Sequence, residues 1–296
     1  MHVPAPNESS AQDVAFAIAD LVARGGVAVL SGAGISTDSG IPDYRGPDGQ
    51  RRVQPMTIAE FRQGPGQRQR YWARAYVGWD RFCSARPNAS HVAVAQLQRH
   101  AFVGTVITQN VDGLHQQAGA VDVIELHGSL AVVRCLTCER HYRRAEIQDQ
   151  LSALNPDFAA LTGRMTAGLP VIQPDGDVAL VEELVRRFRH PRCPGCGGDE
   201  LKPDVVFFGE NVPRERVDAC MEVVDTAAAL LVLGSSLRVM SGLRFVRRAH
   251  ARGIPVAAIT RGPTRGDELI SHRLDGDLAS ALGTLVSRLT AGAQPG

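Results

Sequence analysis

Two apolar runs of this sequence, at residues 102–107 and 121–126, end in polar side chains whose types could do chemistry. The side chains that follow these runs are those of Gln109, Asn110, Asp112 and His127. Amide, carboxylate and imidazole groups placed directly after buried strands lie at the carboxyl edge of a parallel sheet, where open α/β sheets bind their ligands. The region is therefore predicted to be a reaction centre.

Two histidines of this region are candidates for a base, because an imidazole titrates near neutral pH and can take a proton from a hydroxyl. A lone histidine after a strand is most often a satisfied core or surface residue. The position of His127 beside Gly128, at the same predicted sheet edge as Gln109, favours a catalytic role for it. His115 is expected on a short helix after Asp112, where packing explains it.

Four of the six cysteines form two C-x-x-C pairs. These are Cys135, Cys138, Cys193 and Cys196. Four thiolates presented in two pairs match the tetrahedral coordination of zinc. They leave no open coordination position, so the metal is predicted to be structural. The alternative is that these cysteines are free or redox-active.

A glycine-rich segment, Gly32-Ala33-Gly34-Ile35-Ser36, follows a predicted strand at residues 27–30. Glycines at such a junction let the backbone approach a phosphate, and the start of the next helix favours negative charge. Thr37 occupies the place of the third glycine of the dehydrogenase fingerprint, and no acidic residue sits cleanly at the end of a second strand. The segment therefore predicts either a dinucleotide site or a plain tight turn, and a hydride-transfer enzyme is disfavoured. The nearby segment 40–45 is, by itself, typical of a polar loop.

The elements that must position these groups alternate along the chain. Strands are expected at residues 27–30, 102–107, 121–126, 205–208, 229–233 and 255–259, and helical periodicity is clear at 14–22, 243–250 and 278–289. Strands that alternate with helices imply a mostly parallel sheet covered by helices on both faces. The predicted fold class is α/β, with a Rossmann-like parallel sheet.

Two stretches, at residues 46–89 and 131–200, interrupt this alternation and are expected to pack together as a smaller inserted domain. The first would supply a helical module and the second, which holds the cysteine pairs, a zinc module. The discontinuous sheet domain is then expected at residues 12–45, 90–130 and 201–290.

Composition excludes some classes of partner. The chain has 296 residues with 44% hydrophobic and 21% charged residues, which is ordinary for a globular protein. A formal charge of +1 predicts neither nucleic acid nor an anionic membrane as the main partner. No run is long enough to span a bilayer, and residues 1–10 lack the features of a signal or transit peptide, so a cytoplasmic location is expected. The sequence predicts no oligomeric state.

Seven motifs together resemble the sirtuins, the Sir2 family of NAD-dependent protein-lysine deacylases. They are Gly32–Ser36, Gly40–Arg45, Thr108–His115, Glu125–Gly128, the two cysteine pairs, Lys202–Glu210 and Gly234–Leu237, and they occur in the family's order. The resemblance extends over residues 12–290. Residues 70–74, 173–178 and 234–245 are most similar to the class II branch, which includes a mitochondrial lipoamidase and ADP-ribosyltransferase; the lack of a presequence is typical of a bacterial relative.

The resemblance implies that the sheet domain binds NAD. The implied NAD contacts are Gly32, Ala33, Gly34, Ser36, Pro42, Asp43, Tyr44, Arg45, Gln109, Asn110, Asp112, Gly234, Ser235, Ser236 and Thr260. Of these, Ser235 and Ser236 are expected at the start of a second helix, and Thr260 stands where the family often has asparagine. Asn110 and Asp112 are implied to stabilise the cationic ribose as nicotinamide leaves. His127 is implied to be the general base that lets the acyl group migrate to the sugar.

The implied partners are proteins or peptides that carry an acylated lysine. The family binds their backbone by strand addition, here to Val205, Val206, Phe207, Phe208 and Gly209. The products would be nicotinamide, free lysine and O-acyl-ADP-ribose. Two other functions stay open: mono-ADP-ribosyl transfer in the same cleft, and a non-catalytic NAD- or zinc-dependent binding module.

The acyl group itself is only weakly indicated. The spacing of Tyr71 and Arg74 is similar to that by which desuccinylating sirtuins hold an acyl carboxylate. The alternative is a solvated or salt-bridged face of an arginine-rich helix. The working hypothesis at this stage is a preference for a longer or acidic acyl group over acetyl.

Overall fold

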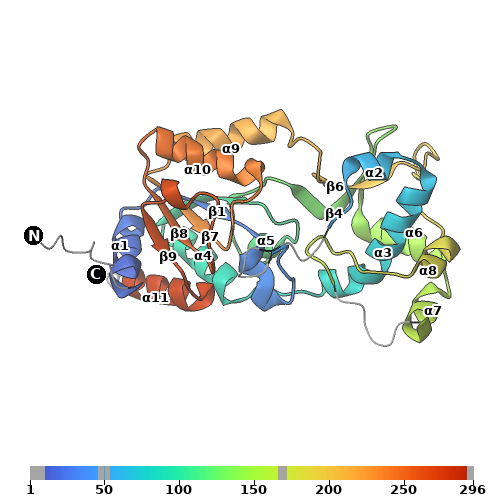
Figure 1. The fold of residues 1–296 in the computed structure, drawn as a ribbon, viewed down its shortest axis with the longest axis horizontal. Helices are drawn as coiled ribbons and strands as arrows, with labels where there is room; N and C mark the ends of the chain where they lie inside the picture. Colours follow the sequence, from blue (N-terminus) through green and yellow to red (C-terminus); the bar gives the residue numbers. More distant parts are fainter. Residues whose placement is uncertain (1–10, 46–49, 51–53, 166–171, 292–296) are drawn as a thin grey trace, which may run out of the picture.

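The computed structural model describes residues 11–45, 50, 54–165 and 172–291. A large domain is built on a six-stranded parallel sheet whose strand order is β3-β2-β1-β7-β8-β9 (Figure 1). The strands are β1 (Val27–Ser31), β2 (Val103–Thr108), β3 (Val123–Glu125), β7 (Ala229–Leu233), β8 (Val256–Ile259) and β9 (His272–Leu274). Every residue of β1 and β7 is buried, because a central parallel strand is covered on both of its faces.

Helices cover this sheet on both sides (Figure 1). One face carries α1 (Ala11–Ala23), α4 (Ala89–Arg99) and α11 (Leu278–Thr290). The other face carries α9 (Arg214–Thr226) and α10 (Met240–Ala251). Successive strands extend outward from β1 in one direction and from β7 in the other, so the sheet has its topological switch point between β1 and β7. Loops at the carboxyl ends of these two strands are the expected place for a ligand.

A smaller domain lies at the right of Figure 1. It contains the antiparallel sheet β5-β4-β6 and several helices. Its elements are α2 (Ile58–Arg62), α3 (Pro65–Cys83), β4 (Gly128–Cys135), β5 (His141–Arg143), α6 (Arg144–Leu154), α7 (Phe158–Met165), α8 (Glu182–Arg187) and β6 (Leu201–Val205). The fully buried Trp72 of α3 anchors its core, and the indole N–H donates to the carbonyl of Leu201 at 2.9 Å.

The predicted α/β class and the parallel sheet are confirmed, and one strand was assigned wrongly. Residues 205–208 were expected in the parallel sheet, but the strand is β6, Leu201–Val205, and it pairs antiparallel with β4 in the small sheet. An apolar run predicts a buried strand, but it does not predict which strand pairs with it. The sequence pattern therefore placed this strand in the wrong sheet. Strands β4, β5 and β9 had no expected counterpart.

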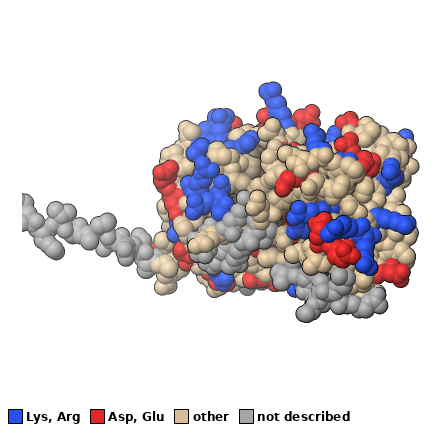
Figure 2. All heavy atoms as spheres, turned by 45° about the vertical axis from the view of Figure 1, so that its right-hand side comes forward, with Lys and Arg blue, Asp and Glu red and all other residues tan. Residues whose placement is uncertain are grey.

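No helix among the described residues is long and apolar enough to cross a membrane. In Figure 2 the small-domain side of the molecule is turned toward the viewer, and basic and acidic side chains are intermixed on this face. That distribution agrees with the near-neutral formal charge of the chain.

Candidate active site

A cleft of about 730 Å³ lies between the two domains, within the range of roughly 300–1,000 Å³ that is usual for small-molecule sites. Its walls include every residue that the resemblance implied for NAD, catalysis or substrate, with the single exception of Pro42. Segments far apart in the sequence therefore meet in one place. The roles of these residues stay proposals, but their assembly into one cleft is a finding.

Two loops at the switch point pack directly on each other. The Gly34 amide donates to the Gly234 carbonyl at 2.8 Å, and a Cβ added at Gly34 would lie 2.7 Å from that oxygen. Gly234 itself has a φ of 57°. Only glycine fits both positions, because a Cβ at either one would collide with the backbone of the other loop.

One expectation about these loops is wrong. Ser235 and Ser236 do not begin a helix, because α10 starts only at Met240. They lie instead in the loop that follows β7. The glycine-rich loop after β1 does lead into a helix, but a short 3₁₀ helix at Ala33–Ser39.

A hydrogen-bonded group of side chains, Ser36, Asn110 and Asp112, forms part of the cleft floor. The Ser36 hydroxyl donates to Asp112 at 2.7 Å and accepts from the Asn110 amide at 3.0 Å. The Asn110 amide also donates to the carbonyl of Gly32 at 3.2 Å. Burial raises the pKa of Asp112, and hydrogen bonds from the Leu114 N–H and the Ser36 hydroxyl oppose that rise. These side chains are held in one arrangement before any ligand enters.

His127 follows β3, at the carboxyl edge where it was expected. Its Nδ1 lies 2.8 Å from the carbonyl of Gln109, and its Nε2 lies 2.8 Å from the hydroxyl of Ser241. A carbonyl only accepts, so Nδ1 carries the proton and Nε2 is the basic nitrogen. Burial lowers the pKa of His127, and the Gln109 hydrogen bond partly offsets this. The neutral, base-competent form is thus favoured at neutral pH.

His115 does not reach the cleft. It lies on the short helix α5 (Leu114–Gln117), as expected, and is 1% exposed. Its Nε2 lies 2.9 Å from the Ser31 hydroxyl, and its ring stands edge-to-face on His91 at a centroid distance of 5.0 Å. His91 in turn lies 3.5 Å from the Ser36 hydroxyl. The His91–His115 pair therefore lies under the cleft floor and supports the Ser36, Asn110 and Asp112 group from below. Neither imidazole faces the cleft.

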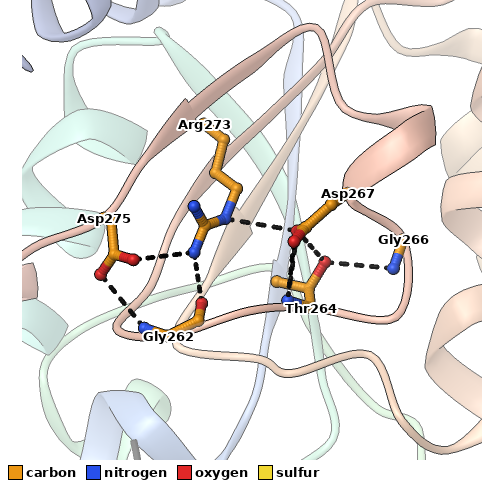
Figure 3. Close-up of polar contacts among 6 residues, drawn as sticks. All are labelled: Gly262, Thr264, Gly266, Asp267, Arg273 and Asp275. Atoms are coloured by element: carbon orange, nitrogen blue, oxygen red, sulfur yellow. Dashed lines mark hydrogen bonds and ion pairs between the residues drawn. The ribbon is translucent and has the colours of Figure 1, made fainter.

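The loop after β8 forms the far end of the cleft, where Thr260 and Arg261 line it. Arg273 of β9 fixes this loop by ion pairs to Asp267 at 3.3 Å and Asp275 at 3.0 Å, and by a hydrogen bond to the Gly262 carbonyl (Figure 3). The same carboxylate of Asp267 accepts from the hydroxyl of Thr264 at 2.6 Å. These ion pairs and hydrogen bonds therefore fix the conformation of the loop after β8.

The segment implied to bind substrate, residues 205–209, forms the opposite wall. The Val206 N–H donates to the carbonyl of His127 at 2.8 Å, which joins this wall to the backbone of His127. Phe208 forms an isolated parallel bridge with Thr57, and its ring contacts Tyr44 edge-on at 5.9 Å. Only Val205 of this segment belongs to a strand.

Four thiols form a separate cluster in the small domain. The Sγ atoms of Cys135, Cys138, Cys193 and Cys196 all lie within 4.8 Å of one another. Two of the separations are 3.7 and 3.6 Å, close to the roughly 3.8 Å that a tetrahedral zinc with 2.3 Å bonds imposes. They are also far too long for disulfides. The cluster fits structural zinc and lies outside the cleft lining.

Two arginines of α3, Arg68 and Arg74, form ion pairs with carboxylates of the small domain. Arg74 lies 3.0 Å from Asp177, and Arg68 lies 2.8 Å from Asp199. Tyr71 lines the cleft, whereas Arg74 does not. The salt-bridged interpretation of the Tyr71 and Arg74 spacing is thus the one that the contacts support.

Sequence reasoning missed three residues of this site. Ser241 holds the basic nitrogen of His127, His91 supports Ser36, and Asp175 lines the cleft beside Tyr71. Each comes from a loop or helix whose orientation is set by tertiary packing. The Asn88–His91 capping box at the start of α4 is the only local sign that His91 has a fixed side chain.

Known proteins share both the sequence and the architecture. A family model described as Sir2 family matches residues 32–241. NAD-dependent protein deacetylase 1 of Streptomyces coelicolor is 54% identical over 273 residues, covering 92% of this chain and 89% of the relative. A deacetylase of Xanthomonas campestris is 51% identical over 258 residues, covering 87% and 85%.

Solved structures agree. A Sir2–p53 peptide–NAD+ complex has a TM-score of 0.70 at 28% identity, covering 94% of this chain and 98% of the other. Sir2Af2 bound to a myristoylated histone peptide has a TM-score of 0.67 at 26% identity, covering 95% and 98%. The matched family model spans more than half of the sequence and includes His127 and both cysteine pairs, so this chain belongs to the Sir2 family.

Proposed function

We propose that this chain is an NAD-dependent protein-lysine deacylase that releases nicotinamide, free lysine and O-acyl-ADP-ribose. The observation that carries the proposal is that one cleft joins a pair of glycine loops at the sheet's switch point to a histidine whose Nε2 is unprotonated. The curated relatives, named as NAD-dependent protein deacetylases, support the same activity.

When bound, NAD supplies an electrophilic ribose carbon and nicotinamide as the leaving group. The two loops that contain Gly32, Gly34 and Ser235 would hold its pyrophosphate, with the Ser235 hydroxyl as one donor. Asn110 and Asp112, fixed by Ser36, would hold the nicotinamide ribose and stabilise positive charge that develops on it. The glycine-only contact between the two loops supports this fit, since a side chain at Gly34 or Gly234 would push the loops apart.

His127 would remove a proton from a ribose hydroxyl at Nε2. The Ser241 hydroxyl occupies that nitrogen at 2.8 Å, so a ribose hydroxyl would take its place as the hydrogen-bond donor. The Gln109 carbonyl keeps Nδ1 protonated and would stabilise the imidazolium that forms. The acyl-lysine chain would enter between residues 205–209 and the loop before α10.

Zinc would be structural. It would hold the two cysteine knuckles together and take no part in the reaction, because its ligands lie outside the cleft lining. A cytoplasmic location and the class II resemblance belong to this proposal as well.

The test follows nicotinamide release with and without an acetyl-lysine peptide. We expect release that depends on the peptide, together with O-acyl-ADP-ribose, and a loss of at least about 100-fold in His127→Ala. His250→Ala, at an exposed position of α10, is the matched control and should retain activity. Peptide-independent labelling of protein from NAD would instead support ADP-ribosyl transfer. Absence of turnover with every peptide, whether or not NAD binds, would support a non-catalytic NAD- or zinc-dependent module.

A further inference from the structure

The part of the cleft on the small-domain side of His127 is apolar. Leu130 lies three residues after the base, and its N–H donates to the carbonyl of Val111 at 3.1 Å. Tyr71 and Phe207 complete this wall, with ring centroids 5.4 Å apart. All four side chains line the cleft and belong to the small-domain core. An acyl group that passes the base would extend into this end, so the inference below rests on the proposed function.

A tight loop at residues 172–178 closes that apolar end. Internal hydrogen bonds fix it: the N–H of Gln173 donates to the Asp177 carbonyl at 2.7 Å, and the N–H of Gly176 donates to the Gln173 carbonyl at 2.9 Å. Pro174 and Asp175, at its tip, line the cleft.

This loop is also fastened to helix α3. The Arg74 Nε donates to the carbonyl of Val178 at 2.8 Å. At Gly78, an added Cβ would overlap the carbonyl oxygen of Gly176, so the loop lies directly on the helix backbone. The side chain of Asp175 is therefore held at a fixed place at the apolar end.

The charges around this end are unequal. Two carboxyl groups, Asp175 and Asp177, face one guanidinium at close range, that of Arg74, and the exposed Arg70 attracts Asp177 more weakly. Arg74 is ion-paired with Asp177 at 3.0 Å, and only Asp175 of the three lines the cleft. The next guanidinium, that of Arg144, stacks 4.6 Å over the ring of Trp79 and lines no part of the cleft.

Burial of Asp175 and Asp177 also disfavours further negative charge at the apolar end. It raises the pKa of Asp175 and, together with repulsion from Asp175, raises the pKa of Asp177 to about 8. A rise in these pKa values means that the surroundings already disfavour a second negative charge. An incoming carboxylate would add one more beside Asp175, and neither Arg74 nor Arg144 lines the cleft to receive it.

We propose that Asp175 makes this chain selective for lysines whose acyl group is uncharged, and that it excludes acyl groups ending in a carboxylate. The acidic half of the sequence-based hypothesis is thereby replaced. Longer uncharged acyl groups stay compatible with the apolar wall.

The test compares one peptide carrying either succinyl-lysine or succinamyl-lysine, which differ only in a terminal carboxylate or amide. For the wild-type chain we expect kcat/KM to favour the amide by at least about tenfold, since like charges placed close together repel each other. Asp175→Asn should reduce the ratio of the two kcat/KM values by about tenfold. Asp80 is an exposed carboxylate on α3, and Asp80→Asn should leave this ratio unchanged.

A binding measurement separates this inference from the proposed function. Fluorescence anisotropy of the two labelled peptides should give the same order of affinities, and the same effect of Asp175→Asn, without any turnover. Equal kcat/KM and equal affinity for the two acyl groups, or an unchanged ratio in a folded Asp175→Asn protein, would overturn the inference. Lack of turnover of every acyl peptide, with the affinity ratio intact, would overturn only the proposed function.

Discussion

Acidification should destabilise this protein through the two buried histidines under the cleft floor. His91 and His115 are 0% and 1% exposed, and burial lowers their pKa values to about 3 and about 4. The Ser31 hydroxyl donates to Thr108, so it accepts from Nε2 of His115, whose Nδ1 has no partner among the described residues. Neither imidazole can be protonated without burying a charge beside the other ring.

Proton linkage gives the sign and the size of the change in the free energy of unfolding with pH. Each histidine is neutral when folded and has a pKa near 6.5 when unfolded, so the unfolded chain binds more protons below pH 6.5. Stability is therefore present above pH 6.5 and is lost as the pH falls toward 4. From pH 6 to pH 5, each histidine should lower the free energy of unfolding by about 1 kcal/mol.

Other groups titrate in the same window, so only differences between variants are decisive. The pKa of Asp177, raised to about 8, contributes with the opposite sign, because the folded chain then holds a proton that the unfolded chain releases. The free energy of unfolding should be measured by urea titration at pH 6 and pH 5 with zinc present. Between these two pH values it should fall by about 1 kcal/mol less in His115→Gln than in the wild type. His250→Gln controls for loss of an exposed imidazole. Equal slopes in the wild type and in a folded His115→Gln protein would refute the reasoning.

Three further outcomes are expected. Ser241→Ala removes the hydroxyl that stabilises neutral His127, so the acidic limb of the kcat/KM profile should move to higher pH by up to about one unit, and an unmoved limb would count against that contact. Gly34→Ala places a methyl group 2.7 Å from the Gly234 carbonyl and should weaken NAD binding at least about tenfold by calorimetry. Zinc chelation, or Cys135→Ser, should unfold the small domain by circular dichroism and abolish activity; full activity of a folded, metal-free sample would contradict this.

Much of the large domain could be predicted because its signals are local. The run at residues 229–233 matches β7 residue for residue, and the periodic residues 278–289 lie within α11. A parallel strand is buried on both faces, so its sequence is a continuous apolar run that needs no knowledge of its neighbours. The polar residues after β2 and β3 were also placed correctly, since the carboxyl ends of parallel strands meet at one edge.

The rest depended on pairings between distant residues. Strand β9 has three half-buried residues, His272–Leu274, and its place is set by pairing with β8. Strand β6, Leu201–Val205, shares only Val205 with the apolar run at residues 205–208, and it pairs with β4, some seventy residues earlier in the chain. Ser241 is one of several serines near α10, and only its distance to His127 distinguishes it. No sequence pattern encodes such distances.

The pairing of β4 with β6 also explains how a zinc site can govern a reaction that it does not touch. Strand β4 begins at Gly128, directly after the proposed base, and ends at the zinc ligand Cys135. Its partner β6 ends at Val205, where the proposed substrate segment begins, and the Val206 N–H donates to the carbonyl of His127. The thiolate cluster at one end of this two-stranded ribbon thus fixes both the base and the peptide wall at the other. Loss of the metal would displace them together, which is why we expect one structural event to remove both folding and activity.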